Sequence, residues 1–219
     1  MEGIKVMKGV KFGAYRSDTD LGLVLYSKKI SPPIVRKVTV EVPGRDGNID
    51  ITEALTGRVM YEDRVISFVF RVPNPKEKWV SVYSGVLNKI HGKAMEIVLD
   101  DDPDYIYTGR VSIDDFATNR TLSEIAVTCT VNPKKTYKTP VKKSISVSGT
   151  KALTVTNAGV PIVPEITADK AMDVVFNGKT YHLSPGKNKV FDILLPEGDS
   201  KLSFSGNGNI TVEFKVQSL

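Results

Sequence analysis

The chain has 219 residues, of which 41% are hydrophobic and 25% charged, a composition typical of a globular protein. Its net charge of +5 is shared between both halves of the sequence, which argues against the dense cationic surface of a nucleic-acid-binding protein. No apolar run approaches the ~20 residues of a membrane-spanning helix, so the sequence predicts no transmembrane segment.

Strands dominate the predicted secondary structure. The N-terminal segment Met1–Val10 intersperses lysines with apolar residues and lacks the apolar core of a signal peptide. Beyond it, apolar residues recur at every second position, which predicts strands with one buried face. Asn177-Gly178 predicts a hairpin, and Gly206–Asn209 predicts another turn. We expect strands at Leu21–Lys29, Ile34–Val42, Arg64–Arg71, Ala94–Leu99, Tyr105–Asp114, Ile125–Val131, Met172–Phe176, Val190–Leu195, Lys201–Phe204 and Ile210–Val216.

The most specific segment, Val42–Ala54, follows the second of these strands. Pro43 ends the strand, and Gly44 and Gly47 permit a tight reversal of the chain. The residues predict an ordered loop with a charged rim. The carboxylates expected to cap backbone N–H groups, and to pair with Arg45 or Arg64, are Asp46, Asp50 and Glu53.

One amphipathic helix is predicted over residues 75–91. Asn74 suits its N-cap, Pro75 its first position, and Gly92 the position just past its end. Apolar residues recur at i, i+4, i+7, i+8 and i+11, so we expect this face to be buried against a sheet. The residues of the face are Trp79, Tyr83, Val86, Leu87 and Ile90.

Carboxylates cluster after the strand Ala94–Leu99, at Asp100, Asp101, Asp102 and Asp104. Such oxygens suit calcium, but the spacing lacks the EF-hand glycine and final glutamate, and Pro103 favours a turn between strands. Asp46, Asp50 and Glu53 would serve a glycoside hydrolase only with two carboxyl groups ~5–9.5 Å apart.

No other pattern predicts chemistry. His91 is expected to interact with the helix dipole, and His182 to lie on a strand of a different domain. Cys129 alternates with apolar residues, so we expect a small core residue and not a nucleophile. A single cysteine also fits synthesis in a reducing cytoplasm. Triad, zinc and P-loop motifs are absent from the sequence, so we expect no catalytic residue, cofactor or metal.

A break in the strand pattern near Asn132–Pro140 divides the chain. We expect a larger domain with the helix over residues 1–135 and an all-β domain over residues 136–219. The break is rich in lysine, which we interpret as a solvated linker and not as a phosphate-binding patch. Its basic residues are Lys134, Lys135, Lys138, Lys142 and Lys143.

The sequence resembles the phage distal tail (Dit) family, which supplies the tail-tip or baseplate hub of siphophages. The family signature is roughly a strand, then PGxDGxxDxTEA, then a downstream YxxR, which stands here as Tyr61-Glu62-Asp63-Arg64. Other matching segments are Asp20-Leu21-Gly22-Leu23, Ser31-Pro32-Pro33, His91-Gly92-Lys93, Leu99–Pro103 and Gly109-Arg110. The second half matches more loosely, at Asn157-Ala158-Gly159, Asn177-Gly178 and Pro196-Glu197-Gly198.

The resemblance implies a mainly β fold: an N-terminal β-sandwich-like domain with one helix and a β-hairpin extension, and a smaller galectin-like or carbohydrate-module-like C-terminal β-sandwich. It implies a virion protein, made in the host cytoplasm, that forms a hexameric ring at the distal end of the tail tube. The implied partners are the tail tube protein, the tail-tip hub or tail-associated lysin, and the receptor-binding protein. DNA would pass through the ring only as cargo, and no membrane is involved.

Two alternatives follow from the residues alone. A carbohydrate- or cell-wall-binding module of residues 140–219 would need an exposed aromatic platform, whereas burial of Phe176, Tyr181 and Phe191 would favour assembly. A hydrolase would need the carboxylate pair described above. A closed ring needs two different complementary surfaces on each subunit. We expect them within residues 1–131, partly through pairing at the edges of Leu21–Lys29 and Arg64–Arg71.

Overall fold

The computed structural model describes residues 9–54 and 56–219. They form two compact units: one ends at Lys135 and also takes in Leu219, and the other spans Thr136–Ser218. The segment Met1–Val10, for which the sequence predicts no signal peptide, lies outside the described residues except for its last two. The fold is mainly β, as the sequence predicts.

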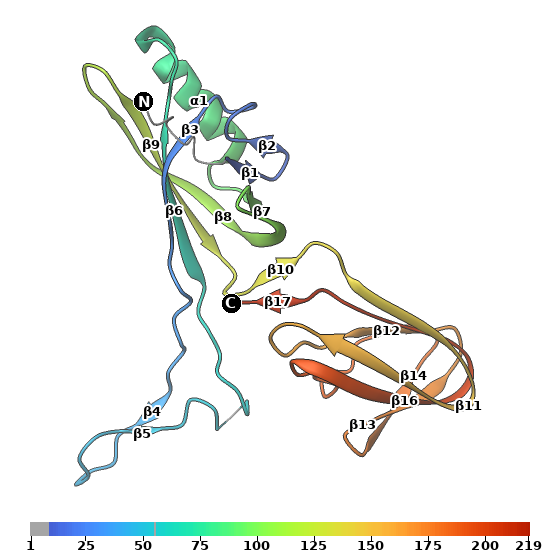
Figure 1. The fold of residues 1–219 in the computed structure, drawn as a ribbon. Coiled ribbons are helices and arrows are strands. Elements are labelled where there is room, and N and C mark those ends of the chain that lie inside the picture. Colours follow the sequence, from blue (N-terminus) through green and yellow to red (C-terminus); the bar gives the residue numbers. More distant parts are fainter. Residues whose placement is uncertain (1–8, 55) are drawn as a thin grey trace, which may run out of the picture. The chain divides into compact units, whose positions relative to one another are not determined.

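One antiparallel sheet forms the first unit, in the strand order β2-β1-β7-β8-β9-β6-β3 (Figure 1). Its strands are β1 Val10–Phe12, β2 Tyr15–Arg16, β3 Val24–Ile30, β6 Arg64–Arg71, β7 Ala94–Leu99, β8 Asp102–Thr118 and β9 Ser123–Val131. The predicted bounds of β6 and β7 are confirmed. Strand β3 begins three residues later than predicted because a turn over residues 17–20 and then Gly22, at φ +64°, precede it.

The sheet of the first unit curls over so that distant strands face each other. Phe12 on β1 lies 5.8 Å from Phe68 and 6.1 Å from Phe70 on β6, measured between ring centroids. Strands β7, β8 and β9 separate β1 from β6 within the sheet. The contact therefore runs across a core, and all three rings are buried in it. This curled sheet is the predicted β-sandwich-like arrangement.

The helix begins later than the sequence predicts. A 3₁₀ turn, η1 Lys76–Lys78, precedes α1 Trp79–Ile90, and neither has a side-chain N-cap. The prediction for Asn74 is wrong: its backbone carbonyl accepts a hydrogen bond from Trp79 Nε1 at 2.7 Å. Gly92 follows the helix at φ +72°, as predicted. On the inner face Trp79, Val86 and Ile90 are buried, while Tyr83 and Leu87 are half-buried.

Between β3 and β6 the chain leaves the sheet as an extension, residues 31–63, which we call the arm (lower left in Figure 1). The strand predicted at Ile34–Val42 is wrong in length. Only β4 Thr39–Val40 pairs, with β5 Ile49–Asp50, and Val35 forms an isolated bridge with Tyr61. Most side chains here are exposed, and a two-stranded ribbon without a core gains little from longer pairing.

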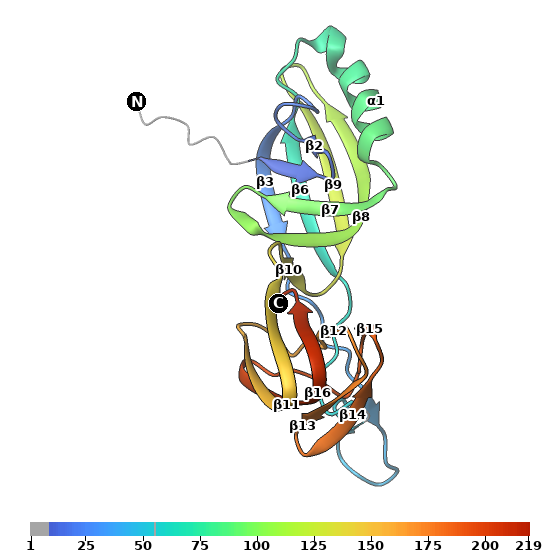
Figure 2. The same cartoon turned by 90° about the vertical axis from the view of Figure 1, so that its right-hand side faces the viewer.

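Strands β11 and β16, each of 17 residues, pair along their whole length and form the frame of the second unit (Figure 2). A sheet in the order β14-β13-β16-β12-β15 surrounds a separate apolar core. The strands of this sheet are β11 Val141–Asn157, β12 Glu165–Ala168, β13 Met172–Phe176, β14 Lys179–Leu183, β15 Gly186–Asn188 and β16 Gly198–Phe214. Outside it, β10 Lys135–Tyr137 pairs with β17 Gln217–Ser218.

The turn predicted at Gly206–Asn209 is wrong, because these residues continue β16. Positions 206 and 208 lie in register with the inward-facing side chains of β16, yet both are glycine. A Cβ at Gly206 would lie 2.8 Å from Met172 Cγ, and one at Gly208 would collide with Asp169. The two glycines therefore leave room for the segment between β12 and β13. The hairpin at Asn177-Gly178 is confirmed, with φ of +49° and +77°.

Two other expectations for the second unit are wrong. Strand β11 carries Lys142 and Lys143, which the sequence assigns to a linker. The strand predicted at Val190–Leu195 is a turn, closed by a hydrogen bond from Ile193 N to Val190 O at 3.1 Å. The turn keeps Ile193 and Leu195 buried, as alternation suggests, but turns Phe191 out to 74% exposure.

Asp169 gives the second unit a testable acid sensitivity. Its carboxylate accepts hydrogen bonds from Asn209 N at 2.7 Å and Asn209 Nδ2 at 2.9 Å, which lower its pKa below the usual 3.8. Because the folded pKa is the lower one, this stabilisation is present above pH 3.8 and is lost as pH falls through the folded value. We expect Asp169→Asn to lower the melting temperature at pH 6, with the gap to wild type shrinking toward pH 3. Asp192→Asn, on an exposed turn, is the control, and an equal gap at both pH values would contradict the expectation.

Candidate assembly surface

The two histidines and the cysteine, the residue types most often used in catalysis, have structural surroundings in this fold. His91 is the C-cap of α1, at the helix C-terminus where the sequence places it, and its Nδ1 accepts a hydrogen bond from Ile113 N at 3.0 Å. His182 lies on β14, exposed, with Nδ1 2.9 Å from Asp173 Oδ1. Cys129 is fully buried, and burial raises its pKa to about 12, so it is an inert core thiol, as expected.

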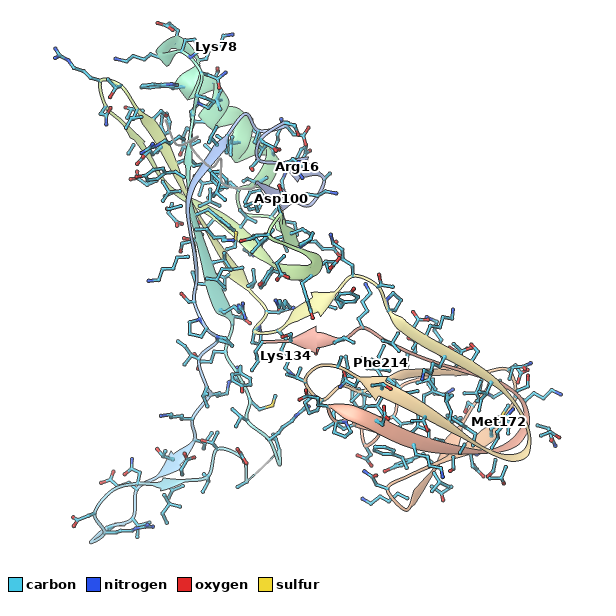
Figure 3. All side chains as sticks on the ribbon, viewed as in Figure 1. Arg16, Lys78, Asp100, Lys134, Met172 and Phe214 are labelled. Carbon is cyan, nitrogen blue, oxygen red and sulfur yellow. The ribbon has the colours of Figure 1, made fainter. Side chains whose placement is uncertain are left out.

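Separate cations pair with three of the four carboxylates in the acidic cluster at the β7–β8 turn. Asp100 pairs with Arg16 at 2.8 Å (labelled together in Figure 3), and Asp101 pairs with Lys28. Asp102 pairs with Lys135 at 2.8 Å. Within residues 9–54 and 56–219, no group of three or more acidic, histidine or cysteine side chains is placed to hold a metal ion. In the same part of the chain, no helix has the length and apolarity to cross a membrane.

The loop of the arm is held by local hydrogen bonds. Gly44 and Gly47 take φ of +79° and +74°, the reversal that the sequence predicts. Asp50 Oδ1 accepts a hydrogen bond from Thr52 N at 2.9 Å, and contact with Thr52 lowers the pKa of Asp50. The expected pairing of Asp46, Asp50 and Glu53 with arginine is wrong, since no ion pair between described residues joins them to Arg45 or Arg64.

The lysine-rich stretch is not a single patch. Lys135 pairs with Asp102, Lys142 lies 3.7 Å from Glu213, and Lys143 donates to Thr154 O at 3.0 Å. Their nearest partners are therefore carboxylates and a carbonyl on neighbouring strands, an arrangement that leaves no cluster of free ammonium groups among these three for phosphate.

Aromatic residues of the second unit serve mainly its core. Phe176, Phe204 and Phe214 are buried, and Tyr137 and Tyr181 are half-buried against the same core. The prediction that Phe191 lies in the core is wrong. Its side chain is exposed, with Lys189 Nζ 5.9 Å from the ring centroid. One exposed ring is not the platform that a sugar-binding module needs.

An open sheet edge is the first feature suited to assembly. Strand β3 ends the sheet of the first unit, and its Val24, Tyr26 and Ile30 are exposed apolar residues. An exposed edge of this kind is a template for pairing with another chain. The prediction of a second edge at β6 is wrong, because β6 lies between β9 and β3. Val24 and Tyr26 lie within the predicted strand, and Ile30 follows its last residue. The position of this strand at the border of the sheet depends on strand order.

The arm is the second such feature. Its exposed large apolar residues are Ile34, Val38, Val40, Ile49 and Met60, with Ile34 at 64% exposure. The arm has no core of its own in which to bury them, so they are available to another chain. Pro32-Pro33 and Pro43-Gly44, which flank the outgoing segment, are the sequence signal for a projecting ribbon, because proline removes backbone donors from a ladder.

Comparison with solved structures shows that the chain has the fold of a phage tail hub protein. One matching structure is SPP1 Dit (gp 19.1), described as a paradigm of the hub adsorption apparatus in phages that infect Gram-positive bacteria. The TM-score is 0.71, at 12% sequence identity, over 96% of this chain and 99% of that chain. This match confirms the resemblance read from the sequence at the level of the fold. A scan against protein-family models and a search of curated proteins each return no match.

Proposed function

We propose that this protein is a distal tail protein of the Dit family, a structural component of a phage tail and not an enzyme. The observation that carries the proposal is the fold match over 96% of the chain, which takes in both units and the arm. The motif of residues 43–54 and the downstream Tyr61–Arg64 support it independently. The structural partners of His91, His182, Cys129 and the acidic cluster agree with a non-enzymatic role.

In this proposal six copies form a ring at the distal end of the tail tube, and DNA passes through its channel as cargo. The ring joins the tube protein to the tail-tip hub or tail-associated lysin, with the receptor-binding protein alongside. Residues 1–135 form the ring domain, and residues 136–219 form an outer domain. A closed ring uses two different surfaces on each subunit. The edge of β3 is one candidate surface, and the arm is another.

The proposal predicts a mass near six times 24.0 kDa for the full-length protein as its concentration rises, measured by multi-angle light scattering. Tyr26→Lys places a charge on the open edge of β3 and should reduce this mass toward that of the monomer. Val80→Lys is the matched control, since Val80 is 66% exposed on the helix, away from the edge. A two-fold dimer, or a monomer at every concentration, would count against the ring. If Tyr26→Lys and Val80→Lys reduce the mass equally, the edge of β3 is not part of the interface.

A further inference from the structure

Arg64 is a buried cation with an unused donor. It is the last residue of the Tyr61–Arg64 motif and opens β6, and only 6% of its surface is exposed. Its Nη1 donates to Pro133 O at 3.3 Å, and its guanidinium carbon lies 5.1 Å from the centroid of the Tyr107 ring. Its Nε is buried without a hydrogen-bond partner among the described residues. Such a group costs free energy. Because Nε has almost no exposed surface, Arg64 would meet a partner through the part of its side chain that lines a neighbouring pocket.

A pocket at the base of the arm contains this arginine. Pro32 and Pro33 line it from the start of the arm, and Tyr61 and Arg64 line it from the end, beside Ile30 and Leu219. Both ends of the YxxR motif therefore meet at one place. The side chains that line it are apolar apart from those of Tyr61, Ser31 and Arg64, which suits an acidic side chain with apolar neighbours.

Charges of both signs surround Arg64, and Glu62 and Asp63 directly precede it in the chain. Asp102 is the carboxylate that interacts with Tyr107, and Lys135 already pairs with it at 2.8 Å. Lys134 follows Pro133 directly, and burial together with the nearby Arg58 lowers its pKa. No ion pair in the described part of the chain involves Arg58, Arg64 or Lys134. An anionic partner would relieve the repulsion between Arg58 and Lys134.

The outer part of the arm carries the complementary charge. Residues 41–54 hold four carboxylates and one cation, Arg45. Asp50 is engaged with Thr52, whereas Glu41, Asp46 and Glu53 are exposed and form no side-chain hydrogen bond or ion pair with another described residue. Apolar residues flank these acids, Val40 and Val42 beside Glu41 among them. One chain thus carries both an unfilled cationic pocket and an uncovered acidic segment.

We propose that the pocket at Arg64 receives a carboxylate from residues 41–54 of a second copy of this chain. The two most specific motifs of the sequence would then meet between adjacent subunits and not within one. The contact is of the heterologous kind that a ring requires, so the inference rests on the proposed function and adds the residues that hold neighbours together.

The test neutralises the acidic segment in the full-length protein with Glu41→Gln, Asp46→Asn and Glu53→Gln together. These side chains are exposed, so melting should not change. Self-association, measured by sedimentation velocity across a concentration series, should weaken by about 30-fold or more, the loss typical of a desolvated charge pair. The matched control is Glu77→Gln, Asp192→Asn and Glu197→Gln, three exposed acids elsewhere, which should leave association unchanged.

Arg64→Gln tests the other half of the contact. If Arg64 contacts the acidic segment, Arg64→Gln by itself should weaken self-association. Combined with the neutralised acidic segment, it should cause little further weakening. Should Arg64→Gln fail to fold, the arm variant decides alone. If the variant with the neutralised acidic segment associates as strongly as wild type, the proposed contact is wrong, whereas the proposed ring is not affected. A wild-type protein that stays monomeric throughout would overturn the ring, and with it this contact.

Discussion

Gly109→Ala is expected to destabilise the first unit by about 4 kcal/mol or more, a large part of the 5–15 kcal/mol that holds a typical domain folded. Gly109 lies on β8 opposite Val131 of β9. A Cβ there would lie 2.5 Å from Val131 Cα and closer still to Thr130 O, which are backbone atoms in the middle of the sheet. Neither can move without breaking the pairing of β8 with β9. Denaturant unfolding followed by circular dichroism measures the loss.

Gly85→Ala is the matched control, because it makes the same chemical change on α1, where no atom lies within 4 Å of the new methyl group. Alanine is the better helix former, so this variant should be more stable than wild type by about 0.5–1 kcal/mol. The two substitutions should therefore change the stability in opposite directions. A Gly109→Ala protein with wild-type stability would show that β8 and β9 are not packed as described.

Trp79→Ala is expected to cost about 3–5 kcal/mol. Trp79 begins α1, is 92% buried in the core of the first unit, and donates its indole hydrogen to Asn74 O at 2.7 Å. Truncation would remove the largest side chain that attaches the helix to the sheet and leave Asn74 O without its donor. Thermal and urea unfolding followed by far-ultraviolet circular dichroism would measure the change, since the substitution removes the only tryptophan.

Trp79→Phe separates the two contributions, because it keeps most of the buried ring and loses the hydrogen bond. Its cost should be nearer 1 kcal/mol. A cost below 1 kcal/mol for Trp79→Ala, combined with loss of self-association, would assign Trp79 to a subunit interface and not to the core.

The sequence alone determined elements whose signal is local. Ile66, Phe68 and Phe70 alternate in β6, and the bounds of that strand follow directly. The apolar face of α1 follows from helical periodicity, although its first turn is 3₁₀ and uncapped by Asn74. Asn177-Gly178 specifies its hairpin because few residue pairs tolerate two positive φ angles. The motif of residues 43–54 was specific enough to suggest the Dit fold, which the structure bears out.

Only the tertiary structure decided features that depend on distant partners. The local sequence at Gly206 and Gly208 predicts a turn. In the structure both glycines lie inside a strand, because the segment at Met172 occupies the space that side chains at these positions would fill. Ile34–Val42 has strand periodicity, yet no core face supports it. The edge position of β3 follows from strand order, and the unsatisfied Nε of Arg64 follows from how β6 is buried. Periodicity reports which residues avoid water, whereas pairing, edges and unpartnered groups are set by contacts far apart along the chain.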